Sequence, residues 1–196
     1  MNEISPPKTA RGEATRRQIL NAAEAVIGAK GYRDASISDV TRQAGVGQGT
    51  FYIYFRSKDE VFRELVLEMG RLTRHTLTEA VRDAPDRLTA ERLGLEAFLR
   101  FVAKHPTLYR IVEEAQFVDP EAYRTYFQSF ADRYRIGLEQ AAAEGEIRPG
   151  DPEVRAWALM GMAKTLGERF AVWDSEKPID AVTAAAWDLI ENGLKP

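Results

Sequence analysis

Residues 36–58 read SISDVTRQAGVGQGTFYIYFRSK. This stretch predicts two short helices on either side of a turn at Gly45-Val46-Gly47. The first helix begins at Ser36, whose hydroxyl can cap it, with Asp39 in the first turn. The second runs from about Gly47 to Phe55. Two helices joined by so short a glycine-containing turn are typical of a helix-turn-helix.

The second of these helices has two different faces. Phe51 and Phe55 are four residues apart, so we expect them to face inward together with Val40 and Val46. The other face carries tyrosine, isoleucine, glutamine and threonine, an unusual set for a purely solvated surface. Glutamine can contact adenine through two hydrogen bonds, a threonine methyl can contact thymine, and tyrosine hydroxyls commonly reach phosphates. This pattern indicates a helix that enters the major groove of DNA through Gln48, Thr50, Tyr52, Ile53 and Tyr54.

Neighbouring residues extend the predicted DNA contact. Gly49 allows the helix backbone to approach the groove closely. The start of the preceding helix, with Ser36 and Ser38, offers backbone N–H groups suited to a phosphate. Further charge contacts along the rim are expected from Arg16, Arg17 and Lys58.

Composition sets the class of protein. The chain has 196 residues, of which 44% are apolar and 29% charged, as in soluble globular proteins. No apolar run approaches the roughly 18–20 residues of a membrane span, and residues 1–10 lack the apolar centre of a secretory signal. We therefore expect no membrane contact and a cytoplasmic location. The chain has no cysteine, and its two histidines, His75 and His105, have no clustered partners, so no metal site or cofactor is expected.

The net charge of −3 is unevenly distributed. Residues 1–60 hold nine Lys and Arg against seven Asp and Glu, and residues 61–196 hold eighteen against twenty-three. Phosphate binding needs a local basic face rather than a basic protein. The asymmetry agrees with nucleic-acid binding by the N-terminal part, although it is modest.

The whole chain reads as helix. Periodicity, caps and prolines divide it into about nine helices without sustained strand alternation, which predicts an all-α fold. The first helix carries its apolar stripe from Ile19 to Ile27 and stops at Gly31. Ser57-x-x-Glu60 is a capping box for a long fourth helix. We place a boundary there, between an N-terminal three-helix unit and a larger helical body.

The N-terminal part resembles the TetR/AcrR family of bacterial transcriptional regulators. The shared residues are the Lys-Gly-Tyr after the first helix, the Ala-Gly-Val turn, and the run Gly-Thr-Phe-Tyr-Ile-Tyr-Phe-x-Ser-Lys. Gly47 departs from the pattern, because many members carry serine there, and a weaker helix cap results. The resemblance implies base contacts by Ser38, Gln48, Gly49, Thr50, Ile53 and Tyr54, and phosphate contacts by Ser36, Thr50, Tyr52 and Lys58.

The resemblance also implies a domain plan. Residues 1–10 are expected to be a disordered tail, residues 11–57 the DNA-binding domain, and residues 58–196 the domain for effector binding and dimerisation. The partners implied are double-stranded operator DNA, an apolar or aromatic small-molecule effector, and a second copy of the chain bound through the last two helices. The implied function is a repressor released from a pseudo-palindromic operator by its effector, with activation as the other possibility.

Nine of the nineteen aromatic residues lie between residues 98 and 134. From the sequence alone a tightly packed core is favoured over a pocket, whereas the resemblance favours a pocket for an effector. The residues expected to line it are Met69, Leu72, Phe98, Phe101, Tyr109, Phe117, Tyr123, Phe127, Trp157 and Met160.

The sequence offers no catalytic constellation, so an enzyme is not expected. It has no glycine-rich phosphate loop with lysine and no nucleophile elbow. The alternative to a DNA-binding regulator is a helical ligand-binding or interaction module that lacks operator-specific DNA binding.

Overall fold

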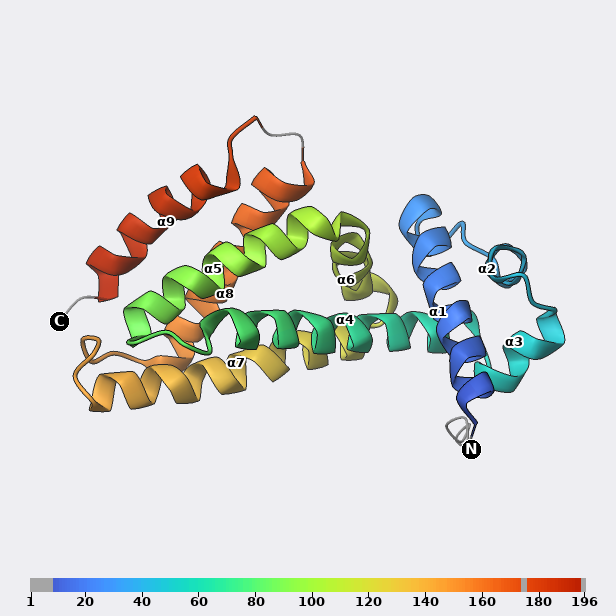
Figure 1. Cartoon of the computed structure of the whole chain (residues 1–196), viewed down its shortest axis with the longest axis horizontal. Coiled ribbons are helices and arrows are strands. Elements are labelled where there is room, and N and C mark those ends of the chain that lie inside the picture. Colours follow the sequence, from blue (N-terminus) through green and yellow to red (C-terminus); the bar gives the residue numbers. More distant parts are fainter. Residues whose placement is uncertain (1–8, 174–175, 195–196) are drawn as a thin grey trace. The chain divides into compact units, whose positions relative to one another are not determined.

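The computed structural model describes residues 9–173 and 176–194. Within these ranges the chain forms nine α-helices and one π-helical turn, without a strand, and the all-α prediction is confirmed (Figure 1). The elements are α1 (Ala10–Lys30), α2 (Ile37–Ala44), α3 (Gln48–Tyr54), α4 (Lys58–Val81), α5 (Arg87–Lys104), α6 (Pro106–Val118), α7 (Pro120–Ala143), α8 (Pro152–Gly167), η1 (Glu168–Val172) and α9 (Ile179–Leu194). None of the described helices is both long enough and apolar enough to cross a membrane.

The chain divides into two compact units. The first unit comprises residues 1–69 and 107–126, and the second comprises residues 70–106 and 127–196. Helices α4 and α7 therefore contribute residues to both units. The predicted DNA-binding segment, residues 11–57, belongs wholly to the first unit, and its role as a separate domain stays a prediction. The predicted tail lies outside the described residues up to residue 8, and the described part begins with Thr9, which caps α1.

In the first unit, α1 is the central support of the helix-turn-helix. Thr9 accepts a hydrogen bond from the Gly12 N–H (3.1 Å), and the helix ends at Gly31, which has a φ of 80°. Gly31 is therefore in the left-handed region that residues with side chains rarely adopt. The predicted apolar stripe is buried, and apolar side chains of α2, α3 and α4 are buried in the same unit. The buried residues of this unit include Ile19, Leu20, Ala23, Ile27, Val40, Phe51, Phe55, Val61 and Phe62.

Helix α6 belongs to the same unit and lies close to α1. A Cβ built on Gly28 would lie 1.8 Å from Thr107 Cγ2, so a larger residue at this point of α1 would require the Thr107 side chain to move. The carboxylate of Glu114 accepts hydrogen bonds from the backbone N–H of Tyr32 at 2.8 and 2.9 Å. These contacts tie α6 to the loop that leads into α2.

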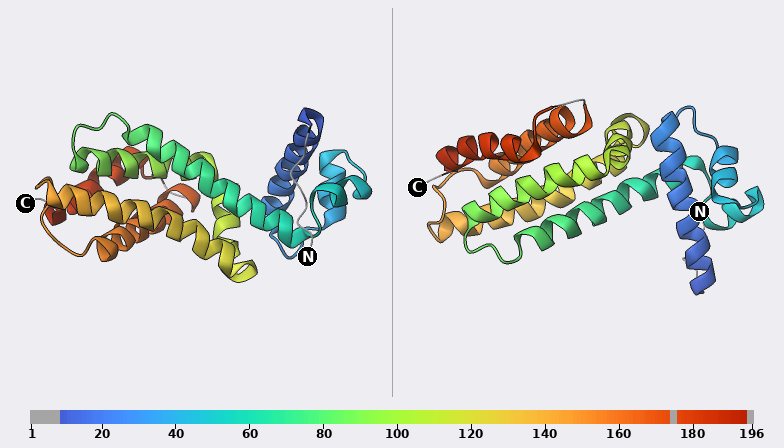
Figure 2. Two further views of the ribbon diagram at one scale, coloured as in Figure 1. Left: turned by 90° about the horizontal axis from the view of Figure 1, so that it is seen from below. Right: turned by 45° about the horizontal axis from the view of Figure 1, so that its top comes forward.

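The second unit is a helical bundle around α5. Figures 1 and 2 show α8 and α9 running alongside α5. Its core is apolar and is formed by Leu95, Leu99, Leu138, Ala141, Ile147, Ala156, Val182, Ala186, Ile190 and Leu194. The end of α8 approaches α5 closely, since a Cβ on Gly167 would lie 3.2 Å from the Phe98 ring.

One charged group is buried inside this bundle. Glu91 is 5% exposed and is paired with Arg87 Nε at 2.6 Å, and Tyr134 donates its hydroxyl to the same carboxylate. Burial raises the pKa of Glu91, and the charge of Arg87 opposes that shift. A charge buried this deeply is tolerated because both carboxylate oxygens have partners.

Candidate nucleic-acid interface

The turn between α2 and α3 is built around a left-handed glycine. Gly45 has φ 65° and ψ 29°, and its N–H donates to the carbonyls of Arg42 and Thr41. The Val46 N–H donates to the Thr41 carbonyl at 3.0 Å. This geometry closes α2 and starts α3 three residues later, as the sequence predicts.

Helix α3 is anchored by its inner face. Phe51 and Phe55 are 0% and 1% exposed, their ring centroids are 5.8 Å apart, and the Arg16 guanidinium lies 5.2 Å from the Phe55 ring. The predicted inward direction of both phenylalanines is confirmed. Because Gly47 offers no side-chain cap, packing of these rings is what fixes a helix of only seven residues.

The outer face of α3 is open. Tyr52 is 52% exposed and Ile53 is 64% exposed, although neither is a residue type that favours contact with water. Gln48 and Gly49 are exposed as well, and no heavy atom lies within 4 Å of where a Cβ on Gly49 would be. Thr50 and Tyr54 are partly buried. The structure thus gathers the predicted base-reading residues of α3 around one exposed surface, and their contacts with DNA stay a prediction.

Ser38 of α2 joins this surface through Gln48. The side-chain amide nitrogen of Gln48 donates to Ser38 Oγ at 2.8 Å. The two residues are ten apart in sequence, and both side chains are exposed. The sequence places both near DNA, and it does not reveal that they bond to each other.

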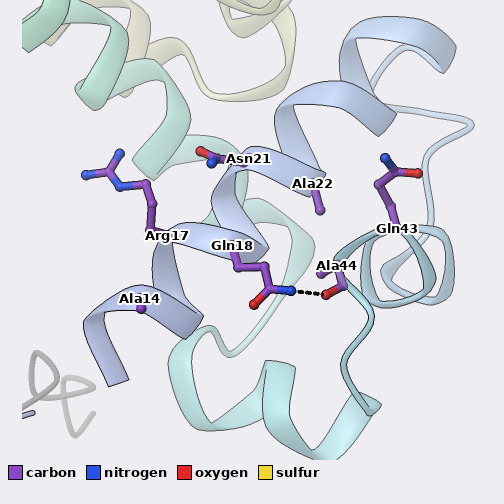
Figure 3. A pocket seen from close by; sticks show the side chains of 7 residues that line it. All are labelled: Ala14, Arg17, Gln18, Asn21, Ala22, Gln43 and Ala44. Carbon is purple, nitrogen blue, oxygen red and sulfur yellow. Dashed lines mark hydrogen bonds between the residues drawn. The ribbon is translucent and has the colours of Figure 1, made fainter. Parts of the chain in front are cut away.

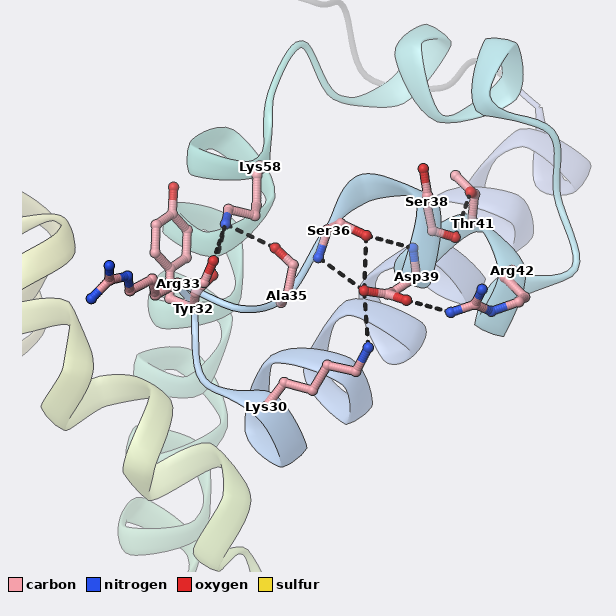
Figure 4. A network of polar contacts seen from close by, with 10 residues as sticks. All are labelled: Lys30, Tyr32, Arg33, Ala35, Ser36, Ser38, Asp39, Thr41, Arg42 and Lys58. Carbon is pink, nitrogen blue, oxygen red and sulfur yellow. Dashed lines mark hydrogen bonds and ion pairs between the residues drawn. The ribbon is translucent and has the colours of Figure 1, made fainter.

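The start of α2 is held by a reciprocal capping box (Figure 4). Ser36 Oγ accepts from the Asp39 N–H (3.1 Å), and the Asp39 carboxylate accepts from the hydroxyl of Ser36 (2.8 Å) and its N–H (3.3 Å). Lys30 pairs with the same carboxylate at 3.0 Å, and Arg42 also contacts it. The hydrogen bonds from Lys30 and then Ser36 lower the pKa of Asp39 to about 2. The predicted cap is confirmed, and a phosphate contact by Ser36 stays a prediction.

Lys58 has a structural role that the sequence does not indicate. Its ammonium donates to the carbonyls of Tyr32 at 2.7 Å and Ala35 at 2.8 Å, and lies 4.1 Å from the Tyr32 ring (Figure 4). Lys58 is the first residue of α4, so it fastens α4 to the loop before α2. The contact between Lys58 and phosphate remains a prediction. A phosphate would compete with these bonds, because an ammonium has three donors and the Arg33 carbonyl, at 3.4 Å, is a third acceptor.

Tyr32 adds further contacts between this loop and α4. Its hydroxyl donates to the Asp59 carboxylate, and its ring packs edge-on against Phe62 with centroids 4.9 Å apart. Burial, followed by the hydrogen bond to Asp59, raises the pKa of Tyr32. No signal in the sequence beyond the Lys-Gly-Tyr motif indicates these partners, because they come from other helices.

The predicted rim arginines are engaged with α4. Arg16 lies 3.3 Å from Glu64, and Arg17 is paired with Glu68. An open groove of about 460 Å³ lies beside them between α1 and the end of α2 (Figure 3). It is lined by Ala14, Arg17, Gln18, Asn21, Ala22, Gln43 and Ala44, and the Gln18 amide crosses it to the Ala44 carbonyl at 2.6 Å. That hydrogen bond satisfies a carbonyl left open at the end of α2.

The predicted effector residues fall into both units. Met69, Tyr109, Phe117 and Tyr123 belong to the first unit, and Leu72, Phe98, Phe101, Phe127, Trp157 and Met160 belong to the second. Met69, Phe101 and Tyr109 are buried, whereas Phe117 is 83% exposed. Phe117 therefore lines no enclosed cavity in the single chain. Leu72 and Trp157 are also exposed, at 38% and 41%, and the choice between pocket and packed core stays open for the rest. In the described part of the chain, no group of three or more His, Asp or Glu residues is arranged to hold a metal ion.

Helices α2 and α3 form a helix-turn-helix, and the outer face of α3 is open to solvent. This is the structure of a helix-turn-helix transcriptional regulator. Residues 19–65 match the family model described as bacterial regulatory proteins, TetR family. The N-terminal segment of the chain, with its helix-turn-helix, therefore matches the TetR family of transcriptional regulators.

Similarity to known proteins extends beyond residues 19–65. The chain is 28% identical over 191 residues to an uncharacterized HTH-type transcriptional regulator, YdgC, of Bacillus subtilis, with 95% of each chain covered. It is 30% identical over 130 residues to the HTH-type transcriptional regulator EthR of Mycolicibacterium smegmatis, covering 62% of this chain and 60% of EthR.

Solved structures share the fold. FadR of Bacillus subtilis, crystallised with stearoyl-CoA, has a TM-score of 0.80 at 20% identity, with 90% of this chain and 98% of FadR covered. AibR, crystallised with isovaleryl coenzyme A and operator DNA, has a TM-score of 0.74 at 18% identity, with 89% of this chain and 97% of AibR covered. At these identities the likeness shows the fold.

Proposed function

We propose that this chain binds a pseudo-palindromic operator as a homodimer and is released from it by a small apolar effector, most simply as a repressor. The observation that carries the proposal is the open outer face of α3, with Tyr52 and Ile53 exposed over a buried Phe51 and Phe55. Two such faces, about 34–36 Å apart in a dimer, match successive major grooves on one side of a duplex. The cytoplasm is the proposed location, because a bacterial operator lies there.

Selection from random duplexes tests the DNA-binding part. We expect the chain to enrich a site with two related half-sites in inverted orientation, and the affinity for it to fall steeply as salt rises. Equal recovery of all sequences at every salt concentration would instead support the helical ligand-binding module without operator recognition.

The last two helices support the dimer. On α8, Val154, Trp157, Ala158 and Gly161 are exposed and share one face by their spacing of three and four residues. On α9, Ala181, Ala184, Ala185 and Leu189 are exposed on one face, opposite the buried Val182, Ala186 and Ile190. Small residues at such spacing let two helices approach closely, as a two-fold interface requires.

Light scattering tests this interface. The unsubstituted chain is expected to have twice the chain mass of 22.0 kDa, and Ala185→Arg is expected to shift it to the monomer. Ala143→Arg, at an exposed alanine at the end of α7, is the matched control and should leave the dimer intact. A stable monomer of the unsubstituted chain at micromolar concentration would overturn the dimer.

The effector is proposed to be an acyl or aromatic molecule. Support comes from the aromatic residues between positions 98 and 134, and from the acyl-CoA ligands of the FadR and AibR crystals. We expect long-chain or branched acyl-CoA to raise the melting temperature and lower operator affinity, whereas coenzyme A alone should do neither. By linkage, the operator must weaken effector binding by the same factor.

We propose that the ligand is bound and released unchanged, so the same acyl-CoA should be recovered after incubation.

A path for this coupling starts at α4. Because Lys58 holds the carbonyls of Tyr32 and Ala35, a shift of the first turn of α4 displaces the loop that leads into α2. Effector binding is proposed to favour a state in which α4 has moved and the spacing of the two α3 helices no longer fits the grooves. A reporter gene behind the selected operator distinguishes repression, where deletion of the regulator raises expression, from activation, where deletion lowers it.

A further inference from the structure

Gln48 and Ser38 form a hydrogen-bonded pair at the centre of the exposed surface. Gln48 is the first residue of α3, and Ser38 is the second residue of α2. The 2.8 Å bond from the Gln48 amide nitrogen to Ser38 Oγ therefore bridges the two helices of the helix-turn-helix.

The bond decides what Gln48 can still offer to a base. A glutamine amide has two N–H donors and one carbonyl acceptor. Since one donor is held by Ser38, one donor and the acceptor remain. Adenine presents one acceptor (N7) and one donor (the N6 amino group) in the major groove, whereas guanine presents two acceptors, N7 and O6. The remaining pair matches adenine, and it lacks the second donor that guanine needs.

The surroundings make Ser38 the residue that orients Gln48. Gly47 and Gly49 stand on either side of Gln48, so neither neighbour in the sequence has a side chain that could restrict the exposed glutamine. Ser38 itself is held in place, because α2 is capped by Ser36 and Asp39 and the Ser38 carbonyl accepts from Thr41 Oγ1 at 3.2 Å. A long polar side chain fixed in this way loses less rotamer freedom when it binds.

We infer that Gln48 reads one adenine in each half-site and that Ser38 is a positioning residue which fixes the Gln48 amide. This inference rests on the proposed function and deepens it, since it names the base that is read. It also changes the expectation for Ser38, from a residue that contacts a base to one that acts through Gln48.

Competition binding with duplexes that vary one base pair at a time tests this inference. The unsubstituted chain is expected to prefer adenine at one position of each half-site by roughly 10-fold or more. Gln48→Ala should lose that preference and keep the others. Ser38→Ala should weaken the preference at the same position, whereas Ser38→Thr, which keeps the hydroxyl, should restore it. Helix content and the salt dependence of non-specific binding should be the same in all variants.

A modified base sharpens the result. Replacing the adenine by 7-deazaadenine removes the N7 acceptor, which should weaken binding of the unsubstituted chain and leave Gln48→Ala unaffected. A preference for guanine at that position, or a Ser38→Ala variant that changes a different base pair, would overturn the inference while the proposed function stands. Absence of any sequence preference in the unsubstituted chain would overturn both.

Discussion

Gly49 lies inside α3, where almost any other residue would favour the helix. The space around it is empty, with no heavy atom within 4 Å of a Cβ position. A glycine that packing does not require indicates that another molecule approaches the backbone at this point.

Gly49→Ala is expected to raise the free energy of unfolding by about 0.5–1 kcal/mol, because alanine has the higher helix propensity. The same methyl group should weaken operator binding, because it stands between α3 and the floor of the groove. Urea denaturation and fluorescence anisotropy measure the two effects. Gly45→Ala is the contrasting control, since Gly45 has a φ of 65° and alanine there should destabilise the fold. Unchanged operator affinity of Gly49→Ala would contradict the proposed close approach.

For single residues, the sequence predicts local features better than contacts between residues far apart in the chain. The Ser36 cap and the inward faces of Phe51 and Phe55 follow from spacings of three and four residues. The contacts of Lys58 and the Ser38–Gln48 pair join separate elements, so no local pattern specifies them. Likewise, the sequence suggests a phosphate contact for Lys58 and does not reveal the carbonyls it already holds.

Helices α1 and α6 approach each other closely at Gly28 and Thr107. Gly28→Ala is expected to destabilise the first unit by roughly 1–3 kcal/mol, since its Cβ would overlap Thr107 Cγ2. Thr107→Ala removes the overlapping methyl group, so the double variant should recover much of the loss. A double-mutant cycle from urea denaturation measures this coupling. Strictly additive effects of the two substitutions would mean that the helices are not packed at this point.

The capping box of α2 makes a pH-dependent contribution to stability. The folded pKa of Asp39 is about 2, against an ordinary value of 3.8, because hydrogen bonds from Lys30 and then Ser36 favour its charged form. The contribution is therefore present above about pH 4 and is lost as the pH falls through about 2. Asp39→Asn removes the charge, so its unfolding free energy should differ from that of the unsubstituted chain at pH 6. The difference should shrink between pH 4 and 2. A difference that is independent of pH in this window would exclude Asp39 as its source.

The sequence predicts well where helices occur, and it predicts poorly how they pack against each other. Caps and prolines locate helix starts such as Asp151-Pro152, where Asp151 accepts from the N–H of Glu153 and Val154. The π-helical turn η1 after α8 has no comparable signal. The Arg87–Glu91–Tyr134 network is also unpredicted, because a charged residue on a helix is usually solvated and only tertiary packing buries it.

For the whole molecule, the all-α fold and the family follow from the sequence, whereas the effector site does not. Residues such as Tyr109 and Phe127 belong to different compact units, and exposed Phe117 belongs to no enclosed cavity of the single chain. Aromatic clustering in a sequence reports burial as readily as it reports a pocket, so it cannot choose between them. Small residues do not settle which faces of α8 and α9 are exposed either, since Ala156 and Ala186 are buried while Ala158 and Ala185 are exposed.

We propose that the outer face of α3 reads the operator. Ile53 is the residue on this face that is best suited to a test, because it is 64% exposed and its truncation leaves no cavity. The measurement is the ratio of affinities for the selected operator and for a scrambled duplex, by fluorescence anisotropy, for the unsubstituted chain and Ile53→Ala. We predict that Ile53→Ala lowers this ratio by roughly 5-fold or more, through loss of apolar contact with a base, while its melting temperature and its affinity for the scrambled duplex stay the same. An unchanged ratio, or an equal loss of affinity for both duplexes, would contradict the claim.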